Sequence, residues 1–219
     1  MNDKMTELVM ILDKSGSMSG LEKDTIGGYN AMLEKQKAQE GSVHVTTVLF
    51  DHHIKILHDR LPIGCIEPLT EKEYQVGGMT ALLDAVGSTI NRIDKIQQAE
   101  AEENRAGKVI FVITTDGFEN SSHEFSYPTL KKLIEAHQKE KDWEFIFLGA
   151  NMDAVAEAGK IGITADRSAT FMNDSEGIAA NYEVLSETVS MMRAAPKGTR
   201  IGAGWKSRIE EDFKKRSGR

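Results

Sequence analysis

Residues 8–12, Leu-Val-Met-Ile-Leu, lead directly into residues 13–17, Asp-Lys-Ser-Gly-Ser. Continuous rather than alternating hydrophobicity is typical of a strand that is covered on both faces, as in the interior of a parallel sheet. The sequence therefore predicts a buried strand over residues 6–13. This strand delivers a carboxylate and two hydroxyl groups to its carboxyl end.

Two later stretches carry matching oxygen donors where a loop meets a predicted element. Thr80 follows paired glycines and stands at or just before a helix, because apolar residues recur at helical spacing over residues 82–93. Residues 108–115 form a second continuous apolar strand, which leads into Asp116. We interpret the three stretches as parts of one site.

Each stretch also has a purely structural explanation. Ser15, Ser17 and Ser19 could cap the following helix. Thr80 could cap its own helix, and Asp13 could end a strand in a turn. The combination is more informative, because all of the donors are hard oxygens of low total charge. Such donors suit magnesium or manganese rather than zinc.

The three stretches together resemble the metal-ion-dependent adhesion site of von Willebrand factor type A (VWA) domains. The resemblance rests on Asp-Lys-Ser-Gly-Ser-Met at residues 13–18, Gly-Met-Thr-Ala-Leu at 78–82 and Thr-Thr-Asp-Gly at 114–117, and it extends over about residues 5–195. It implies an intact site in which two serines and a threonine bind Mg²⁺ or Mn²⁺, and two aspartates hold the ion directly or through water. The residues so implied are Asp13, Ser15, Ser17, Thr80 and Asp116.

The resemblance also implies a function. VWA domains bind other proteins without catalysing a reaction, and one coordination position is left for a carboxylate of the bound protein. The implied partner is thus a protein that donates an Asp or Glu side chain to the metal. Intracellular relatives commonly act as adaptors of ring-forming ATPases or of other assemblies.

Two other classes of function are compatible with a strand-end aspartate in a doubly wound sheet. A magnesium-dependent phosphohydrolase or phosphotransferase would use Asp13 as its nucleophile, but that chemistry calls for a second acid where Ser15 stands. A nucleotide-binding protein would carry a glycine-rich phosphate loop, and neither a Gly-x-Gly-x-x-Gly nor a Gly-Lys-Ser/Thr motif follows the first strand. The sequence favours the binding module over both.

Composition and net charge argue against several classes of protein. The 219 residues are 40% hydrophobic and 28% charged, which is ordinary for a globular domain, and the net charge of −7 argues against a general nucleic-acid binder. One cysteine, Cys65, is consistent with a reducing compartment. We find no signal peptide and no apolar stretch near the roughly 20 residues that span a bilayer. We therefore expect a cytoplasmic protein that binds neither nucleic acid nor membrane.

Strands that alternate with helices predict an α/β fold with a doubly wound, mostly parallel sheet and helices on both faces. Residues 54–57 are predicted to form an antiparallel edge strand. The common strand order 3-2-1-4-5-6 would make the strands ending in Asp13 and Asp116 neighbours at the switch point, where ligands bind in such sheets. Residues 1–198 form the predicted domain, and residues 199–219, with seven Lys/Arg and three Asp/Glu, form a basic tail or an appended helix.

Two local features give further expectations. The first helix is predicted over residues 19–39 with Gly27 and Gly28 in its middle, which close packing against the sheet would explain. Four histidines lie in the strand-turn-strand unit that follows, with no nearby cysteine to complete a zinc site. We expect these to be exposed hairpin residues rather than ligands; they are His44, His52, His53 and His58.

Overall fold

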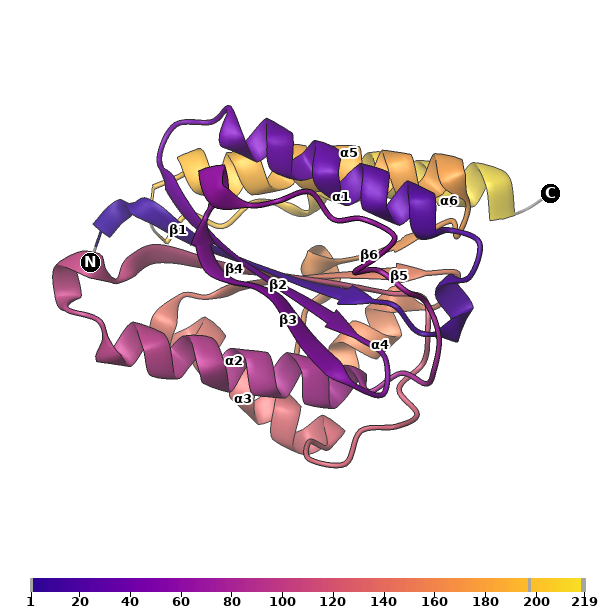
Figure 1. Ribbon diagram of the computed structural model, residues 1–219, viewed down its shortest axis with the longest axis horizontal. Coiled ribbons are helices and arrows are strands. Elements are labelled where there is room, and N and C mark those ends of the chain that lie inside the picture. The colour runs from indigo at the N-terminus through magenta and orange to yellow at the C-terminus, as the bar shows by residue number, and fades with distance from the viewer. Residues whose placement is uncertain (1, 197, 218–219) are drawn as a thin grey trace.

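The structure is a computed structural model that describes residues 2–196 and 198–217. Its centre is a six-stranded sheet in the order β3-β2-β1-β4-β5-β6, parallel throughout except for the β2–β3 pair (Figure 1). The predicted strand order and the predicted antiparallel edge are both confirmed. The strands are β1 (Asn2–Asp13), β2 (Ser42–Phe50), β3 (Ile54–Pro62), β4 (Ala106–Thr115), β5 (Glu144–Ala150) and β6 (Ser168–Phe171).

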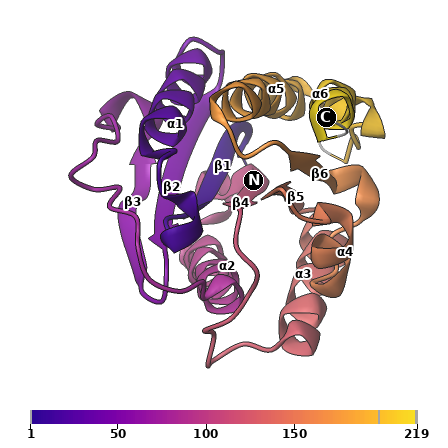
Figure 2. The same cartoon turned by 90° about the vertical axis from the view of Figure 1, so that its right-hand side faces the viewer.

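Helices cover both faces of the sheet, as Figure 2 shows. One layer holds α1 (Glu22–Lys37), α5 (Ser175–Ala194) and α6 (Ser207–Ser217), and the other holds α2 (Leu82–Ala99), α3 (Tyr127–Lys141) and α4 (Ala154–Lys160). Successive residues of β1 alternate between the two resulting cores: Leu8 and Met10 belong to one, Val9 and Ile11 to the other. Two covered faces are the reason why this strand is apolar without interruption.

Local sequence signals set the beginnings of several helices. The Ser126 side chain caps α3 in a reciprocal arrangement with Thr129, and Pro128 lies in the first turn. The Asp153 side chain accepts from the backbone N–H of Ala156 and caps α4. No helix in the described part of the chain is both long and apolar enough to cross a membrane.

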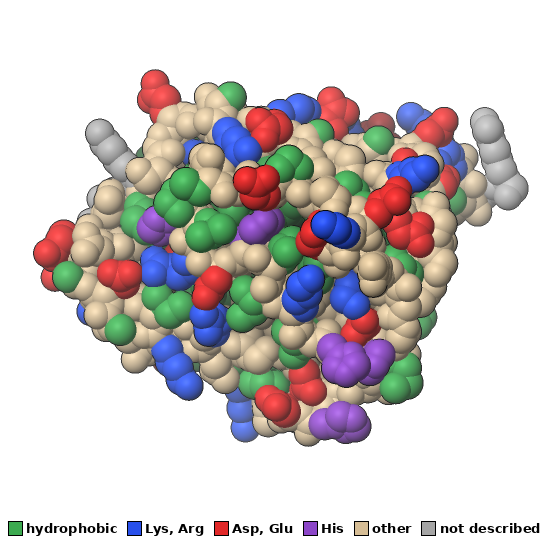
Figure 3. Space-filling model, in the orientation of Figure 1, with side chains coloured by type: hydrophobic (Ala, Val, Ile, Leu, Met, Phe, Trp, Pro, Cys, Tyr) green, Lys and Arg blue, Asp and Glu red, His purple; other side chains and the backbone are tan. Residues whose placement is uncertain are grey.

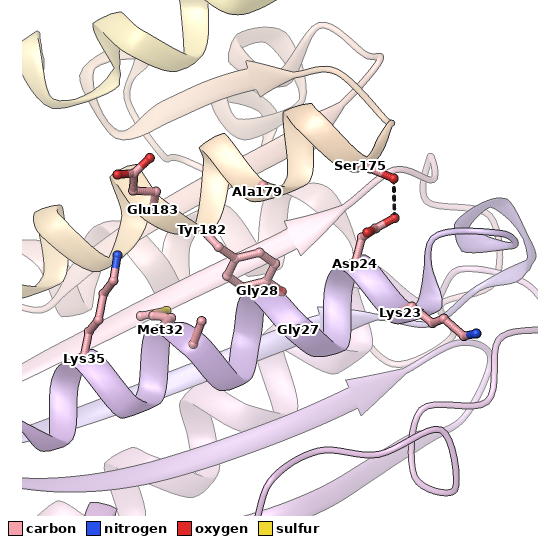
Figure 4. Close-up of a pocket in the computed structure, with 11 residues that line it drawn as sticks. Lys23, Asp24, Gly27, Gly28, Met32, Lys35, Ser175, Ala179, Tyr182 and Glu183 are labelled. Atoms are coloured by element: carbon pink, nitrogen blue, oxygen red, sulfur yellow. Dashed lines mark hydrogen bonds between the residues drawn. The ribbon is translucent and has the colours of Figure 1, made fainter.

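The first helix is shorter than predicted at both ends, since α1 begins at Glu22 and ends at Lys37; a separate 3₁₀ turn at residues 16–18 precedes it. Of the two paired glycines, only Gly28 is closely packed. It packs against helix α5 and not, as expected, against the sheet. A Cβ built at Gly28 would lie 2.3 Å from Cδ2 of Tyr182, whereas one at Gly27 meets nothing within 4 Å (Figure 4). A groove of about 390 Å³ runs between α1 and α5 here, and the hydrogen bond from Ser175 to Asp24 crosses it.

The C-terminal segment ends in a docked helix. Trp205 and Ile209 belong to the core cluster on the α1 and α5 side of the sheet. The indole N–H of Trp205 donates to the carbonyl of Asp166 at 2.8 Å, and the Lys206 ammonium donates to the carbonyl of Ser168 at 2.9 Å. Of the two forms that the sequence allowed for this segment, the structure describes the helix.

Candidate metal site

The three predicted stretches lie together at the carboxyl edge of the sheet. Asp13 is the last residue of β1, and Asp116 follows directly after the neighbouring strand β4. Backbone hydrogen bonds join the loops to one another. Gly16 N–H donates to the Gly78 carbonyl at 3.1 Å, and Asn120 N–H donates to the Thr80 carbonyl at 3.1 Å. The loops therefore hold one another in position.

Three hydroxyl groups converge at one point on this edge. A Cβ built at Gly117 would lie 2.6 Å from the Oγ1 of Thr80 and 3.3 and 3.4 Å from the Oγ atoms of Ser17 and Ser15. The two serine Oγ atoms are themselves 3.1 Å apart. Only glycine at position 117 leaves this space to the hydroxyls.

The two aspartates flank the hydroxyls and are fixed by hydrogen bonds. Asp13 Oδ1 accepts from the Ser15 N–H at 2.7 Å, and its Oδ2 accepts from the Thr115 hydroxyl at 2.5 Å. Asp116 Oδ1 accepts from the Ser17 hydroxyl at 2.5 Å, and its Oδ2 accepts from Asn173 Nδ2 at 3.1 Å. All five residues that the sequence singled out are thus brought together.

The electrostatics of the site favour a cation. Burial raises the pKa of Asp13 to about 6, with a smaller contribution from the nearby Asp116 charge, although hydrogen bonds from Thr115 and Ser15 oppose the rise. Burial also raises the pKa of Asp116. Among the described residues, the hydrogen bonds to the two carboxylates come from Ser15, Thr115, Ser17 and Asn173, and none of these donors is a Lys or Arg. Two carboxylates and three hydroxyls without a cationic side chain form an oxygen donor set of the kind that hard divalent ions prefer.

The capping alternatives raised by the sequence are wrong. Helix α1 begins after Leu21 and α2 begins after Ala81, and neither of these two N-cap residues makes a side-chain capping hydrogen bond. The Thr80 hydroxyl lies with the serine hydroxyls instead. These side chains are therefore not required to satisfy helix ends.

Several supporting residues were not predicted. Asn173 follows β6 at the same edge of the sheet, and its contact with Asp116 spans 57 positions of sequence, so no local pattern identifies it. Asn120 supports the second loop, because its Oδ1 accepts from the Thr80 N–H at 2.8 Å. The Glu119 carboxylate accepts from the N–H groups of Leu83 and Ser121. It orders the loop around the site.

The prediction for the four histidines is right in part. His52 and His53 are exposed in the β2–β3 turn. His58 is buried, and its Nδ1 lies 3.0 Å from the Thr47 hydroxyl, while His44 is half-buried. His58 faces inward because β3 continues to Pro62, beyond the predicted end at residue 57, and pairs with β2 over this longer span.

Comparison with known proteins gives no match by sequence. No protein-family model matches the chain. No curated protein matches it either.

Solved structures do resemble the chain. The von Willebrand factor domain of the type V pili tip protein Mfa5 from Porphyromonas gingivalis aligns with a TM-score of 0.59 at 14% identity, over 89% of this chain and 98% of that one. The ArnB paralog VWA2 from Sulfolobus acidocaldarius gives 0.55 at 20% identity, over 85% and 45%. A von Willebrand factor type A protein from Catenulispora acidiphila gives 0.55 at 15% identity, over 85% and 42%.

This chain spans less than half the length of the last two structures. All three identities are low enough that the likeness concerns the fold alone. The observed architecture, a six-stranded, mostly parallel sheet with one antiparallel edge strand between two helix layers, agrees with this similarity of fold. The chain has the Rossmann-like fold of VWA domains.

Proposed function

We propose that this chain is a non-enzymatic protein-binding module that requires Mg²⁺ or Mn²⁺ held by Asp13, Ser15, Ser17, Thr80 and Asp116. The observation that carries the proposal is the convergence of three hydroxyls around Gly117 between two aspartates whose hydrogen-bond donors, among the described residues, are all uncharged. A divalent ion there would offset the cost of burying the Asp13 carboxylate. Imidazole and thiolate are absent from this donor set, which favours magnesium or manganese over zinc.

The site has a buried side and an open side. Asp13, Ser15 and Thr80 are buried, whereas Ser17 is exposed and Asp116 is partly exposed. An ion held mainly by neutral hydroxyls keeps much of its positive charge toward the open side. A carboxylate of another protein that replaces water there gains an attraction much stronger than that of an exposed salt bridge. We therefore propose that the partner donates an Asp or Glu to the metal.

Two exposed apolar residues are direct sequence neighbours of residues in the site. Met79 directly precedes Thr80 and is 55% exposed, and Phe118 directly follows Gly117 and is 60% exposed. Aromatic residues and methionine are enriched in protein interfaces, and buried aromatic anchors often dominate the binding energy. The partner surface that fits this rim has an acidic side chain next to apolar ones.

The hydrolase alternative receives less support from the same geometry. Asp13 would be the nucleophile, yet it is only 2% exposed, and both of its carboxylate oxygens already accept hydrogen bonds. Position 15 carries a serine, which cannot hold a titratable proton near neutral pH. A phosphomonoester turnover that disappears in Asp13→Asn would reverse this preference.

Metal binding is tested by thermal unfolding and titration calorimetry with Mg²⁺ and Mn²⁺. An ion that binds only the folded state adds roughly 2.7 kcal/mol to the free energy of unfolding at a hundredfold excess over its Kd. Asp13→Ala and Asp116→Ala should abolish this gain. The matched control is Asp153→Ala, which removes another aspartate after a strand, one that caps α4, and should leave the gain intact. Absence of any shift or heat with the wild type would refute the proposed site.

Partner binding is tested by affinity capture in Mg²⁺ with wild type and Asp13→Ala. Proteins that are retained by the wild type, lost from the variant and released by EDTA are the expected partners. Replacing the acidic residues of such a partner one by one should identify the carboxylate. A ring-forming ATPase, the partner class that the family resemblance implies, would be recovered in the same experiment.

A further inference from the structure

The turn between β2 and β3 brings together one carboxylate and two imidazoles. One ligand atom from each of Asp51, His52 and His53 lies within 4.8 Å of the other two. The two imidazole rings are exposed, and their centroids are 4.0 Å apart. Exposed histidine side chains gather on this end of the molecule in Figure 3. We propose that this turn is a second metal site, selective for zinc and similar transition ions.

The distances suit a single ion. Asp51 Oδ1 lies 3.4 Å from the Nδ1 of His52 and 3.6 Å from the Nδ1 of His53. Zinc binds nitrogen and oxygen ligands at about 2.0–2.2 Å, so two ligands of a tetrahedral ion are about 3.4 Å apart. The three side chains therefore need little rearrangement to surround an ion. Their solvent-facing side leaves a position for water or for a group of another molecule.

Asp51 is already oriented for this role. Its side chain is nearly buried, and its Oδ2 accepts a hydrogen bond from the Lys14 ammonium. Its Oδ1 faces the two imidazoles. The Ala81 N–H donates to the Asp51 carbonyl at 2.8 Å and fixes the backbone of the turn. Outer contacts of this kind hold a ligand carboxylate in a fixed direction.

His52 is restrained by packing. A Cβ built at Gly78 would lie 2.2 Å from its Nδ1, so the ring occupies the space that the missing side chain leaves. Gly78 has a φ of +77°, a conformation that other residues rarely adopt. The glycine is thus suited both to its own backbone geometry and to the close approach of the ring.

This site is chemically distinct from the proposed magnesium site. Imidazole suits zinc, copper and nickel, whereas magnesium prefers carboxylate, carbonyl and water oxygens. Zinc binding at the turn can therefore be measured while magnesium is present in excess. The two proposed metal sites share no ligand residue, so each can be tested independently of the other.

The test is a calorimetric Zn²⁺ titration of the untagged full chain in millimolar Mg²⁺. One binding event is expected, and His52→Ala and His53→Ala should each weaken it at least about tenfold. NMR spectra of the imidazole ring nitrogens should show Zn²⁺-dependent changes in chemical shift for these two histidines. His52→Ala and His53→Ala should retain the Mg²⁺-induced thermal shift of the wild type.

Two control variants remove other zinc-binding groups. His123→Ala deletes another exposed histidine, in the loop after β4, and Cys65→Ser deletes the exposed thiol. Neither should change the Zn²⁺ affinity by more than about twofold if Asp51, His52 and His53 form the site. An affinity that is unchanged in both His52→Ala and His53→Ala, or that is lost in Cys65→Ser, would overturn the assignment.

Discussion

Gly117 and Thr80 are in contact across the candidate metal site: a Cβ at Gly117 would lie 2.6 Å from the Thr80 hydroxyl oxygen. Gly117→Ala should therefore displace one of the proposed ligands. We expect at least about a tenfold loss of Mg²⁺ affinity, by analogy with the effect of disturbing groups that orient metal ligands. Titration calorimetry measures this loss directly.

Gly16→Ala is the matched control for Gly117→Ala. Gly16 also lies in a loop of the site, but a Cβ there would approach nothing closer than 3.4 Å, the carbonyl oxygen of Gly78. This variant should bind Mg²⁺ with nearly wild-type affinity. If the two alanine variants bind equally well, the hydroxyls do not form the coordination shell.

The sequence predicts the parts of this site that lie in short local patterns. Asp13, Ser15 and Ser17 follow one buried strand, and the strand order, itself predictable from the alternation of elements, brings Asp116 beside them. The contact of Asn173 with Asp116 is different, because it depends on where β6 ends relative to β4. The Asp51–Lys14 pair likewise joins residues whose proximity is set by the packed loops. Neither contact has a sequence signature.

The paired glycines of α1 give a second prediction, on stability. Gly28→Ala should place its Cβ in the ring of Tyr182, and overpacking of this kind costs about 1–3 kcal/mol. Gly27→Ala meets open space and should stabilise the protein by up to about 1 kcal/mol, because alanine is the better helix former. Urea unfolding of both variants measures the contrast. Equal effects would show that Tyr182 does not pack as described.

Glu7 gives a prediction on pH. Its carboxylate is buried in β1, and burial raises its pKa to about 7, although the Arg60 guanidinium 2.8 Å away opposes the rise. Among the described residues its Oε1 has no hydrogen-bond partner, which is consistent with dominance of the burial effect. The folded protein therefore holds this proton more tightly than the unfolded chain, whose glutamate titrates near 4.5.

The sign of the effect follows from this difference. The stabilising contribution of protonated Glu7 is complete below about pH 4.5 and is lost as the pH rises to about 7. Each pKa unit corresponds to about 1.4 kcal/mol, so the loss is of order 3 kcal/mol. Glu7→Gln should lack this component. Urea unfolding from pH 4.5 to 8 should show the wild type losing stability relative to the variant, and a constant difference would contradict the assignment.

The docked C-terminal helix gives a prediction on folding. Trp205 is 7% exposed and Ile209 is 2% exposed, so their burial favours a helix that belongs to the domain over a dispensable tail. Trp205→Ala should lower the free energy of unfolding by roughly 3 kcal/mol, as for other aromatic truncations in cores. Lys214→Ala, at an exposed position of the same helix, should change it by less than about 0.5 kcal/mol. Soluble, fully stable protein after deletion of residues 199–219 would show that the helix is not needed.

The apolar rim of the metal site gives a prediction on partner binding. Phe118 is 60% exposed beside the hydroxyl site, where a bound protein would cover it. Phe118→Ser should weaken binding of a partner captured by the wild type by about tenfold or more, because truncating an interface anchor commonly costs more than 1 kcal/mol. It should not change the Mg²⁺-induced thermal shift, since the side chain of Phe118 supplies no oxygen to the site.

The control for Phe118→Ser is Met191→Ser, which removes an exposed apolar side chain on helix α5. Met191 lies near the C-terminal end of that helix, whereas its N-terminal end follows Asn173 at the metal edge, so the variant should bind the partner as the wild type does. Surface plasmon resonance with the purified partner in Mg²⁺ compares the two. If Phe118→Ser binds normally while Asp13→Ala does not bind, the metal contributes to recognition but the partner does not cover this rim.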